Sequence, residues 1–346
     1  MTRGRHLAAA ALALAVLAMA PAKACDRACL ASIMDRWLNA LPKHSAAGLP
    51  LAPGIRFTEQ SAVIPVGDGL FISATQAPTA FKIVAADPVS GQVGALVMMK
   101  QWDKPALVAV RLKVMDGKIA EAQHIVATSF FPGGEANLVA PRAAFLSDVP
   151  PAERTPRAQM LAAADAYYQA LEQDDGNLAP FADDCARREN GGQTVLNKRP
   201  MPPPPGVPPK TGAAMAKLGM MTCRAQINAR LFQYITMIRP RMLVVIDEQK
   251  GLVMGFPRFV HRGDVRTMKI VGVKGVDRIP MQFGPIDLQA AEIFKIRSGK
   301  IHEVEANGFT DAYLTPTGWE DRYPETYRYA VTHPRTHPYQ AGTHIP

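Results

Sequence analysis

The stretch FADDCARRENG, residues 181–191, brings a possible catalytic acid close to two arginines. As a strand it places Arg187 and Glu189 on one face, because side chains two positions apart point to the same side. A carboxylate held in this way can act as a general base that takes a proton from carbon next to a carbonyl group. The same pair can equally be an exposed ion pair, which contributes little to stability. The sequence leaves both interpretations open.

Further candidates come from the second half of the chain. His261 ends the strand-like run GLVMGFPRFVH and is either an alternative base or a solvated histidine at a strand end. Tyr234, Arg239 and Arg241 occupy a segment that could form a lid, where Arg239 could hold an acidic group of a substrate. We find no metal-spaced cluster, no glycine-rich phosphate loop and no G-x-S-x-G motif, so neither a metal nor a cofactor is expected.

An internal duplication indicates how these residues are positioned. Three blocks recur in the same order, with spacings that grow from 130 through 160 to 182 residues: RWLNAL with AYYQAL (36–41 and 166–171), VAADPVSGQVGAL with VVIDEQKGLVMGF (84–96 and 244–256), and LVAVRLKVMDGKIAEAQ with QAAEIFKIRSGKIHEVE (107–123 and 289–305). The last pair predicts a strand, a tight glycine turn and a second strand in each copy. The growing spacing places insertions in the second copy.

Comparison of the two hairpins identifies a second acid. In the first copy, valines and a leucine alternate with polar residues, so the apolar face is expected to be the buried one. The same register in the second copy places Glu292 and Phe294 on that face, with Glu292 in place of Val110. Burial disfavours the ionised form, so the pKa of Glu292 should be raised. The alternative is that Glu292 pairs with a buried arginine or lies near water at a strand end.

The elements divide the chain into two similar parts. Helices are expected over 27–41 and 158–172, each followed by strands that end in the paired hairpin. We predict an α+β fold of tandem cone-shaped domains, each with an N-terminal helix and a curved antiparallel sheet. The divisions are a signal peptide (1–24), a first domain (25–129), a Pro- and Gly-rich linker (130–156), a second domain (157–312) with a Pro-rich insertion near 198–210, and a C-terminal tail (313–346).

Three features occur in the same order in the second half: a leading helix with an aromatic residue, the FADD segment with an acid eight residues after its aromatic residue, and a final hairpin with a glycine turn. Together they resemble the nuclear transport factor 2-like superfamily. Within it, the ketosteroid isomerase and SnoaL-like branch is the most similar. The resemblance implies that Tyr167 donates a hydrogen bond to a developing oxyanion, with Tyr168 as a one-residue alternative. It also implies that Glu189 abstracts a proton and that Glu292 is a protonated acid. The first copy keeps Glu59 but has Trp37 and Val110 at the other two positions.

The first 24 residues have a basic start, an apolar run and an A-x-A-like end, as a secretory signal peptide does. A lipoprotein signal is the alternative, since a cysteine follows. Removal of this segment deletes three basic residues, so the net charge falls from +9 to +6 without a basic, aromatic-interleaved stripe, and nucleic acid is not expected as a partner. The remaining chain is expected to be periplasmic or secreted, without membrane contact, and possibly a homodimer.

Four cysteines follow the signal segment, and an even number in an oxidising compartment favours two disulfides. Three pairings are possible. We favour Cys25 with Cys29 and Cys185 with Cys223, because each pair then lies within one half of the chain.

Three functions fit these observations. The first is a cofactor-independent lyase or isomerase that acts on a mostly apolar carbonyl compound. The catalytic residues would be Tyr167, Glu189 and Glu292, and the substrate-binding residues Tyr168, Arg187, Tyr234, Arg239, His261 and Phe294. The second is a non-catalytic binding module for a hydrophobic small molecule. The third is a structural, self-associating protein, which would have no enclosed pocket. The tail is expected to pack across the pocket or on a neighbouring subunit.

Overall fold

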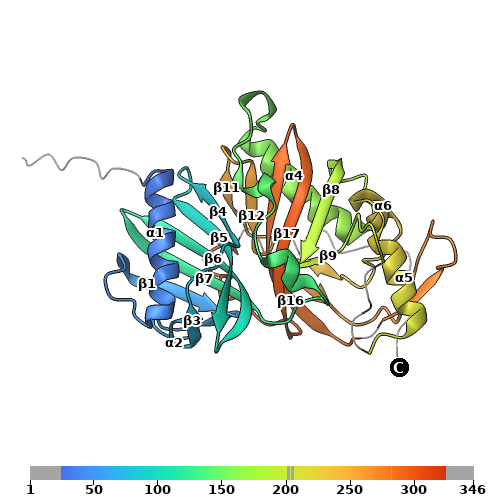
Figure 1. Cartoon of the computed structure of the whole chain (residues 1–346), viewed down its shortest axis with the longest axis horizontal. Coiled ribbons are helices and arrows are strands. Elements are labelled where there is room, and N and C mark those ends of the chain that lie inside the picture. Colours follow the sequence, from blue (N-terminus) through green and yellow to red (C-terminus); the bar gives the residue numbers. More distant parts are fainter. Residues whose placement is uncertain (1–24, 201–202, 204–205, 282, 325–346) are drawn as a thin grey trace, which may run out of the picture.

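The computed structural model describes residues 25–200, 203, 206–281 and 283–324 and shows an α+β protein with two curled sheets (Figure 1). The first half begins with helix α1 (Arg27–Ala40), whose buried face carries Leu30, Met34 and Trp37. Asp26 caps this helix by accepting a hydrogen bond from the backbone N–H of Cys29. A short helix, α2 (Leu70–Ser73), lies between the strands of the first sheet, which are β1 (Leu51–Glu59), β2 (Ala62–Val63), β3 (Ala74–Gln76), β4 (Lys82–Asp87), β5 (Gln92–Gln101), β6 (Lys104–Met115) and β7 (Lys118–Ala127).

The second half has a longer leading helix, α4 (Arg157–Gln173), which buries Tyr167 and Tyr168. Its sheet contains β8 (Phe181–Glu189), β9 (Gly192–Gln193), β10 (Met237–Ile238), β11 (Leu243–Asp247), β12 (Leu252–Gly255), β13 (Arg258–His261), β16 (Ile286–Arg297) and β17 (Lys300–Ala312). The additional elements are the short helix α3 (Ala143–Leu146) between the halves, helices α5 (Pro209–Gly219) and α6 (Cys223–Asn228), and a small hairpin of β14 (Thr267–Lys269) and β15 (Arg278–Pro280).

The two sheets share a strand order. The first runs β2-β1-β7-β6-β5, and the second contains β9-β8-β17-β16, to which β12 and β13 are added. In each, the strand after the leading helix pairs in parallel with the last strand, and the other pairs are antiparallel. The pairing register is also shared, since Val110 lies opposite His124 in the first sheet and Glu292 lies opposite Ala306 in the second. The repeated sequence blocks therefore occupy corresponding strands.

The outer faces of the two sheets pack against each other, and their contact is nearly symmetric. Asp87 at the end of β4 accepts hydrogen bonds from Arg157 at the start of α4 and from the backbone N–H of Ile246. Asp247 at the end of β11 accepts from Arg27 at the start of α1 and from the backbone N–H of Ala86. Each aspartate is fully buried and binds the helix start of the other half. The two halves are thus joined by two equivalent contacts, one from each buried aspartate.

This packing buries residues that alternation alone would place in solvent. Arg111, on the face of β6 opposite the valines, is completely buried. Its guanidinium pairs with Glu121 at 2.8 Å and lies 4.4 Å from the ring centroid of Trp319. The described part of the tail therefore packs on the first sheet, where the Trp319 indole also donates to Thr58 Oγ1 at 3.0 Å. It does not cross the pocket, in contrast to the expectation from the sequence, because the first sheet offers it a buried cation and an apolar surface.

Both favoured disulfides are confirmed. Cys25 is bonded to Cys29 and Cys185 to Cys223, and the described residues contain no free cysteine. The predicted signal peptide (1–24), residues 201–202 and 204–205 of the Pro-rich insertion, and residues 325–346 of the tail lie outside the described residues. Within the described chain, none of the helices is long and apolar enough to span a membrane.

Candidate functional site

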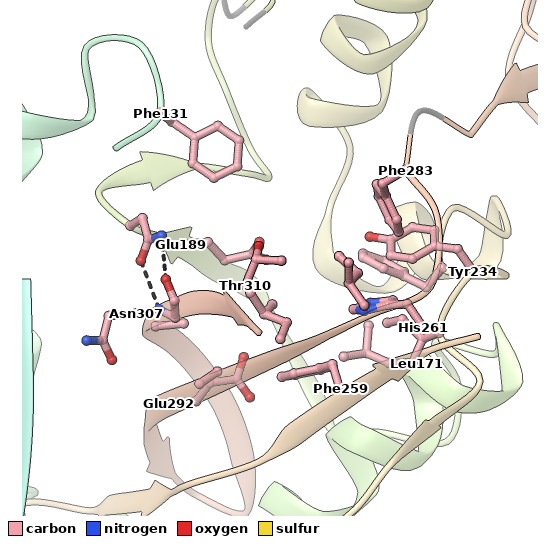
Figure 2. A pocket seen from close by; sticks show the side chains of 18 of the residues that line it. Phe131, Leu171, Glu189, Tyr234, Phe259, His261, Phe283, Glu292, Asn307 and Thr310 are labelled. Atoms are coloured by element: carbon pink, nitrogen blue, oxygen red, sulfur yellow. Dashed lines mark hydrogen bonds between the residues drawn. The ribbon is translucent and has the colours of Figure 1, made fainter. Parts of the chain in front are cut away.

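A cavity of about 310 Å³ lies between helix α4 and the concave face of the second sheet. Strands β8, β16 and β17 form its floor, and loops before β10 and β16 supply aromatic side chains at one end. Figure 2 shows carboxylates from Glu189 and Glu292 at one end and the rings of Tyr234, His261 and Phe283 at the other. The lining residues are Phe131, Tyr167, Leu171, Glu189, Asn190, Phe232, Tyr234, Ile235, Phe259, His261, Phe283, Ile286, Leu288, Ala290, Glu292, Ala306, Asn307, Gly308 and Thr310.

The two carboxylates flank a small residue on the middle strand. Glu189 of β8 pairs with Ala306 of β17, and Ala306 pairs with Glu292 of β16. Neighbouring strands lie roughly 4.8 Å apart, so the two glutamate Cα atoms are about 10 Å apart, on either side of the alanine methyl group. Three residues in one row across a concave sheet point to the same space. The pattern therefore directs both acids at a small molecule placed over Ala306.

Glu292 is a buried acid that is held largely in its neutral form. Glu292 is only 3% exposed, and its Oε2 atom has no hydrogen-bond partner among the described residues. Burial raises the pKa of Glu292 to about 8, with a further increase from the negative charge of Glu189, against opposing effects of the Tyr167 and Tyr168 phenols and of Arg187. At neutral pH this group can therefore donate a hydrogen bond.

The two helix tyrosines have different positions around that acid. Tyr167 lines the cavity, whereas Tyr168 lies behind it, beside Gly255, the strand partner of Glu292. A Cβ atom on Gly255 would come within 3.1 Å of the Tyr168 hydroxyl oxygen, so glycine leaves the space that this phenol occupies. Burial, followed by the charge of Glu292, raises the pKa of both phenols well above the ordinary tyrosine value. Both therefore remain protonated donors.

Glu189 is held by an arginine beneath it. Arg187 Nε lies 3.1 Å from Glu189 Oε1, and the arginine is buried while the glutamate side chain is 39% exposed. Arg187 also donates hydrogen bonds from Nε to Thr194 Oγ1 at 2.9 Å and from Nη2 to Gln226 Oε1. Arg187 Nη1 has no hydrogen-bond partner in the part of the chain that the structure describes. The pair is thus partly buried and fixed, unlike a mobile surface ion pair.

The far end of the cavity is aromatic. His261 stacks on Tyr234 with ring centroids 5.3 Å apart and an angle of 27° between the planes, and Phe283 meets His261 edge-on at 5.6 Å. Burial lowers the pKa of His261 to about 4, although a hydrogen bond with the backbone of Ile286 opposes this effect. The imidazole is therefore neutral at physiological pH, and its buried Nδ1 has no partner among the residues described.

Four predicted substrate-binding residues do not line the cavity: Tyr168, which lies behind it, and Arg187, Arg239 and Phe294. Arg187 lies under Glu189 as described above. Arg239 pairs with Glu172 of α4 at 2.9 Å and so anchors the segment before β11. Phe294 is fully buried and packs edge-on against Tyr167, with 5.1 Å between the ring centroids. These side chains support residues of the wall, and the cavity contacts come from other positions.

The corresponding place in the first sheet is filled. Trp37 Nε1 donates to His124 Nε2 at 2.8 Å, and the other ring nitrogen of His124 bonds to Glu59 Oε2 at 3.0 Å. Glu59 also accepts from the backbone N–H of Leu70 at 3.0 Å. His124 occupies the position of Ala306 between the two flanking strands. An imidazole therefore sits where the second copy leaves open space.

Several lining residues were not identified from the sequence. The insertions and the linker contribute Phe131, Phe232 and Phe283, for which the repeat comparison offers no counterpart. The alternation of small residues Ala306 and Gly308 was a usable signal, because small side chains on an inward face leave room for a ligand. Asn307 turns its amide away from the cavity and donates to the carbonyl oxygens of Leu107 and Ile125 in the first sheet (Figure 2).

Phe131 covers the carboxylate end of the cavity from the linker (Figure 2). A Cβ atom on Gly192 would lie 2.6 Å from the ring of Phe131, so this approach requires glycine at that position. Asn190 is fixed nearby by two hydrogen bonds of 3.0 Å with the backbone of Gly308. The chain between the two sheets thus contributes directly to the wall beside Glu189.

No group of three or more histidine, cysteine, aspartate or glutamate side chains in the described residues is arranged to hold a metal ion.

Comparison with protein families finds a match between residues 153–308 and a domain of unknown function (DUF8021). This range contains β8 and β16 and most of β17, whose last residues, 309–312, lie beyond it. A comparison with curated proteins finds no match.

Among solved structures, the chain is similar to AclR, a proposed hydroxylase of Streptomyces galilaeus. The similarity covers 37% of this chain and 92% of that one, with 13% sequence identity and a TM-score of 0.25. A similarity this low supports no conclusion about the fold or the activity of this chain.

Proposed function

We propose that the protein is a cofactor-independent lyase or isomerase that acts on a mostly apolar compound containing a carbonyl group. The observation that carries this proposal is a single cavity lined by Tyr167, Glu189 and Glu292. A carboxylate and a neutral carboxylic acid face the same space, and a phenol stands beside them. Such a combination is suited to removal of a proton from carbon and to stabilisation of the negative charge that results.

The proposed reaction begins with proton transfer. Glu189 takes a proton from the carbon next to the substrate carbonyl, and the electron pair of the broken C–H bond forms an enolate whose charge lies on oxygen. Tyr167 and protonated Glu292 donate hydrogen bonds to that oxygen. In a substrate with a double bond next to the carbon that loses the proton, the enolate is conjugated and takes the proton back at the far end of that double bond, which is isomerisation. In a substrate with a leaving group on the neighbouring carbon, the enolate expels that group, which is elimination.

We further propose that the chain consists of two tandem cone-shaped domains of the nuclear transport factor 2-like superfamily. Support comes from the shared strand order, the leading helix of each half and the shared pairing register of Val110 and Glu292. Export to the periplasm or beyond is part of the same proposal. The two disulfides support it, because such bonds persist in oxidising compartments.

A non-catalytic binding module is the second candidate. It is favoured by the ion pair of Glu189 with Arg187, because this contact already engages the carboxylate that would have to take the proton. The third function, a structural protein without a pocket, has no support from a chain with a cavity of this size. The first two candidates differ in one observable: an enzyme labilises a C–H bond of the ligand, whereas a binding module returns the ligand unchanged.

Proton exchange tests the proposal without knowledge of the final product. The purified chain is incubated in D₂O with a panel of carbonyl compounds, and incorporation of deuterium next to the carbonyl is followed by mass spectrometry. Glu189→Gln should slow the exchange by about 10²- to 10⁴-fold, the usual contribution of a general base. Asp183→Asn, which changes an exposed acid on the same strand, is the matched control and should leave the rate unchanged. Equal rates in the wild type and Glu189→Gln would remove Glu189 from the mechanism.

A further inference from the structure

The cavity follows one strand from its acidic end to its aromatic end. Ile286, Leu288, Ala290 and Glu292 alternate along β16, and all four line the cavity. At about 3.4 Å per residue, the Cα atoms of Ile286 and Glu292 are roughly 20 Å apart. His261 pairs with Ile286 on the neighbouring strand, so it marks the end opposite Glu292. The acid and the histidine therefore lie at opposite ends of an elongated space.

The volume of the cavity limits the size of a ligand. At about 310 Å³, it corresponds to roughly ten water molecules at about 30 Å³ each. Much of the lining is aromatic or aliphatic, including Phe232, Ile235 and Phe259. This lining favours an apolar ligand body.

His261 differs from the other residues at the aromatic end because it has unused hydrogen-bonding capacity. It is 4% exposed, lines the cavity, and has a buried Nδ1 without a partner in the described chain. Tyr234 stacks on one side of the ring and Phe283 approaches its edge, so the imidazole is held in place (Figure 2). A buried polar atom without a partner is costly, and a ligand that bonds to the ring would remove that cost.

We propose that the cavity binds an elongated, mostly apolar and uncharged compound with a polar oxygen at each end, one against Glu292 and Tyr167 and the other hydrogen-bonded to His261. The histidine is thus a specificity-determining residue that selects ligands by length and by a second hydroxyl or carbonyl group. This inference concerns binding, and it holds whether or not the bound compound is turned over. It goes beyond the proposed acid–base reaction by defining the class of ligand.

Three related probes test the inference: 4,4′-dihydroxybiphenyl, 4-hydroxybiphenyl and 4′-hydroxybiphenyl-4-carboxylate, with affinities measured by isothermal titration calorimetry. The dihydroxy compound should bind about three- to tenfold more tightly than the monohydroxy compound, as expected for one added hydrogen bond. The charged compound should bind most weakly. His261→Phe keeps a ring between Tyr234 and Phe283 and should abolish the difference between the first two probes.

Ala306→His locates the binding, because it places an imidazole where His124 fills the first sheet, and it should abolish binding of all three probes. Four results would each overturn the inference. The two uncharged probes could bind with equal affinity, or their difference in affinity could persist in His261→Phe. The carboxylate could bind most tightly, or none of the probes could bind. Deuterium exchange is measured separately. If exchange is absent while the His261-dependent preference persists, the proposed reaction fails and the ligand class stands.

Discussion

The chemical character of the site depends on two differences between the two copies. Where the first sheet has Val110, the second has Glu292, and where the first has His124, the second has Ala306. The first change introduces a buried acid, and the second removes the side chain that would otherwise bond to the neighbouring glutamate. The pair of differences converts a filled hydrophobic interior into a cavity with two facing acids.

The buried acid should reduce stability as the pH rises. Folded Glu292 keeps its proton up to about pH 8, whereas the unfolded chain releases it near the ordinary value of 4.5. The native state therefore binds more protons between these values, and the free energy of unfolding falls across this window by on the order of 3–5 kcal/mol, at about 1.4 kcal/mol per unit. Glu292→Gln cannot titrate, so its stability advantage over the wild type should grow from pH 4 to pH 8.

Urea unfolding at several pH values measures this difference. Glu135→Gln, a change at an exposed acid, is the control and should follow the wild-type curve within about 0.5 kcal/mol. Parallel curves for the wild type and Glu292→Gln would mean that Glu292 is ionised in the folded protein.

At the scale of elements, strand β8 carries Glu189 and is tied to the inserted helix α6 by the bond between Cys185 and Cys223. The second disulfide, Cys25–Cys29, closes a much shorter loop at the start of α1, with a sequence separation of 4 compared with 38. Loop closure in the unfolded chain costs more entropy when the loop is longer. The two bonds should therefore contribute unequally.

Replacement of both Cys185 and Cys223 by alanine should lower the free energy of unfolding by about 3–4 kcal/mol. The matched double replacement of Cys25 and Cys29 should cost about 2 kcal/mol less. Guanidinium unfolding of the two variants under identical conditions makes the comparison. A larger loss from the short-loop pair would show that loop entropy does not determine the contribution of these bonds.

The sequence predicted the helices and strands correctly where the hydrophobic pattern of one copy matched that of the other. Alternation in the hairpins placed Glu292 on the inward face, since the same register buries Val110 in the first copy. Alternation failed for Arg111, because it identifies one buried face of the strand and cannot show that Trp319 and Tyr323 of the C-terminal segment cover the other face. At the aromatic end of the cavity, Tyr234 and His261 were candidates from the sequence, whereas Phe283 was not, because it comes from an insertion without a repeated counterpart.

At the scale of the whole molecule, the two copies hold each other through buried aspartates. Burial alone would raise the pKa of Asp87, but hydrogen bonds from Arg157, Ser90 and the backbone of Ile246 outweigh it, so the pKa is lowered. The stability that this group contributes is present above the ordinary aspartate pKa of 3.8 and is lost as the pH falls through the lower folded value. The interface should therefore weaken only in strong acid.

Asp87→Ala removes a fully buried carboxylate and leaves the partly exposed Arg157 and the backbone N–H of Ile246 without their acceptor, which should cost about 2–3 kcal/mol. Asp247→Ala removes the symmetric contact with Arg27 and should have a similar effect. Replacement of Asp321, which is exposed and pairs with Arg56 at 3.0 Å, is the control and should cost at most about 1 kcal/mol. Thermal unfolding measures the stability of all three variants. If Asp87→Ala loses no more stability than the control, the buried aspartates do not hold the two halves together.

The proposed chemistry requires a neutral carboxylic acid that faces the cavity at physiological pH. Carbon-13 NMR of protein labelled at the glutamate side-chain carboxyl carbon observes this group directly as the pH is varied. One resonance should titrate with a midpoint at about pH 8 and be absent from the spectrum of Glu292→Gln. If the resonance lost in that variant titrates near the ordinary value of 4.5 instead, Glu292 is an ordinary carboxylate and cannot serve as the proposed donor.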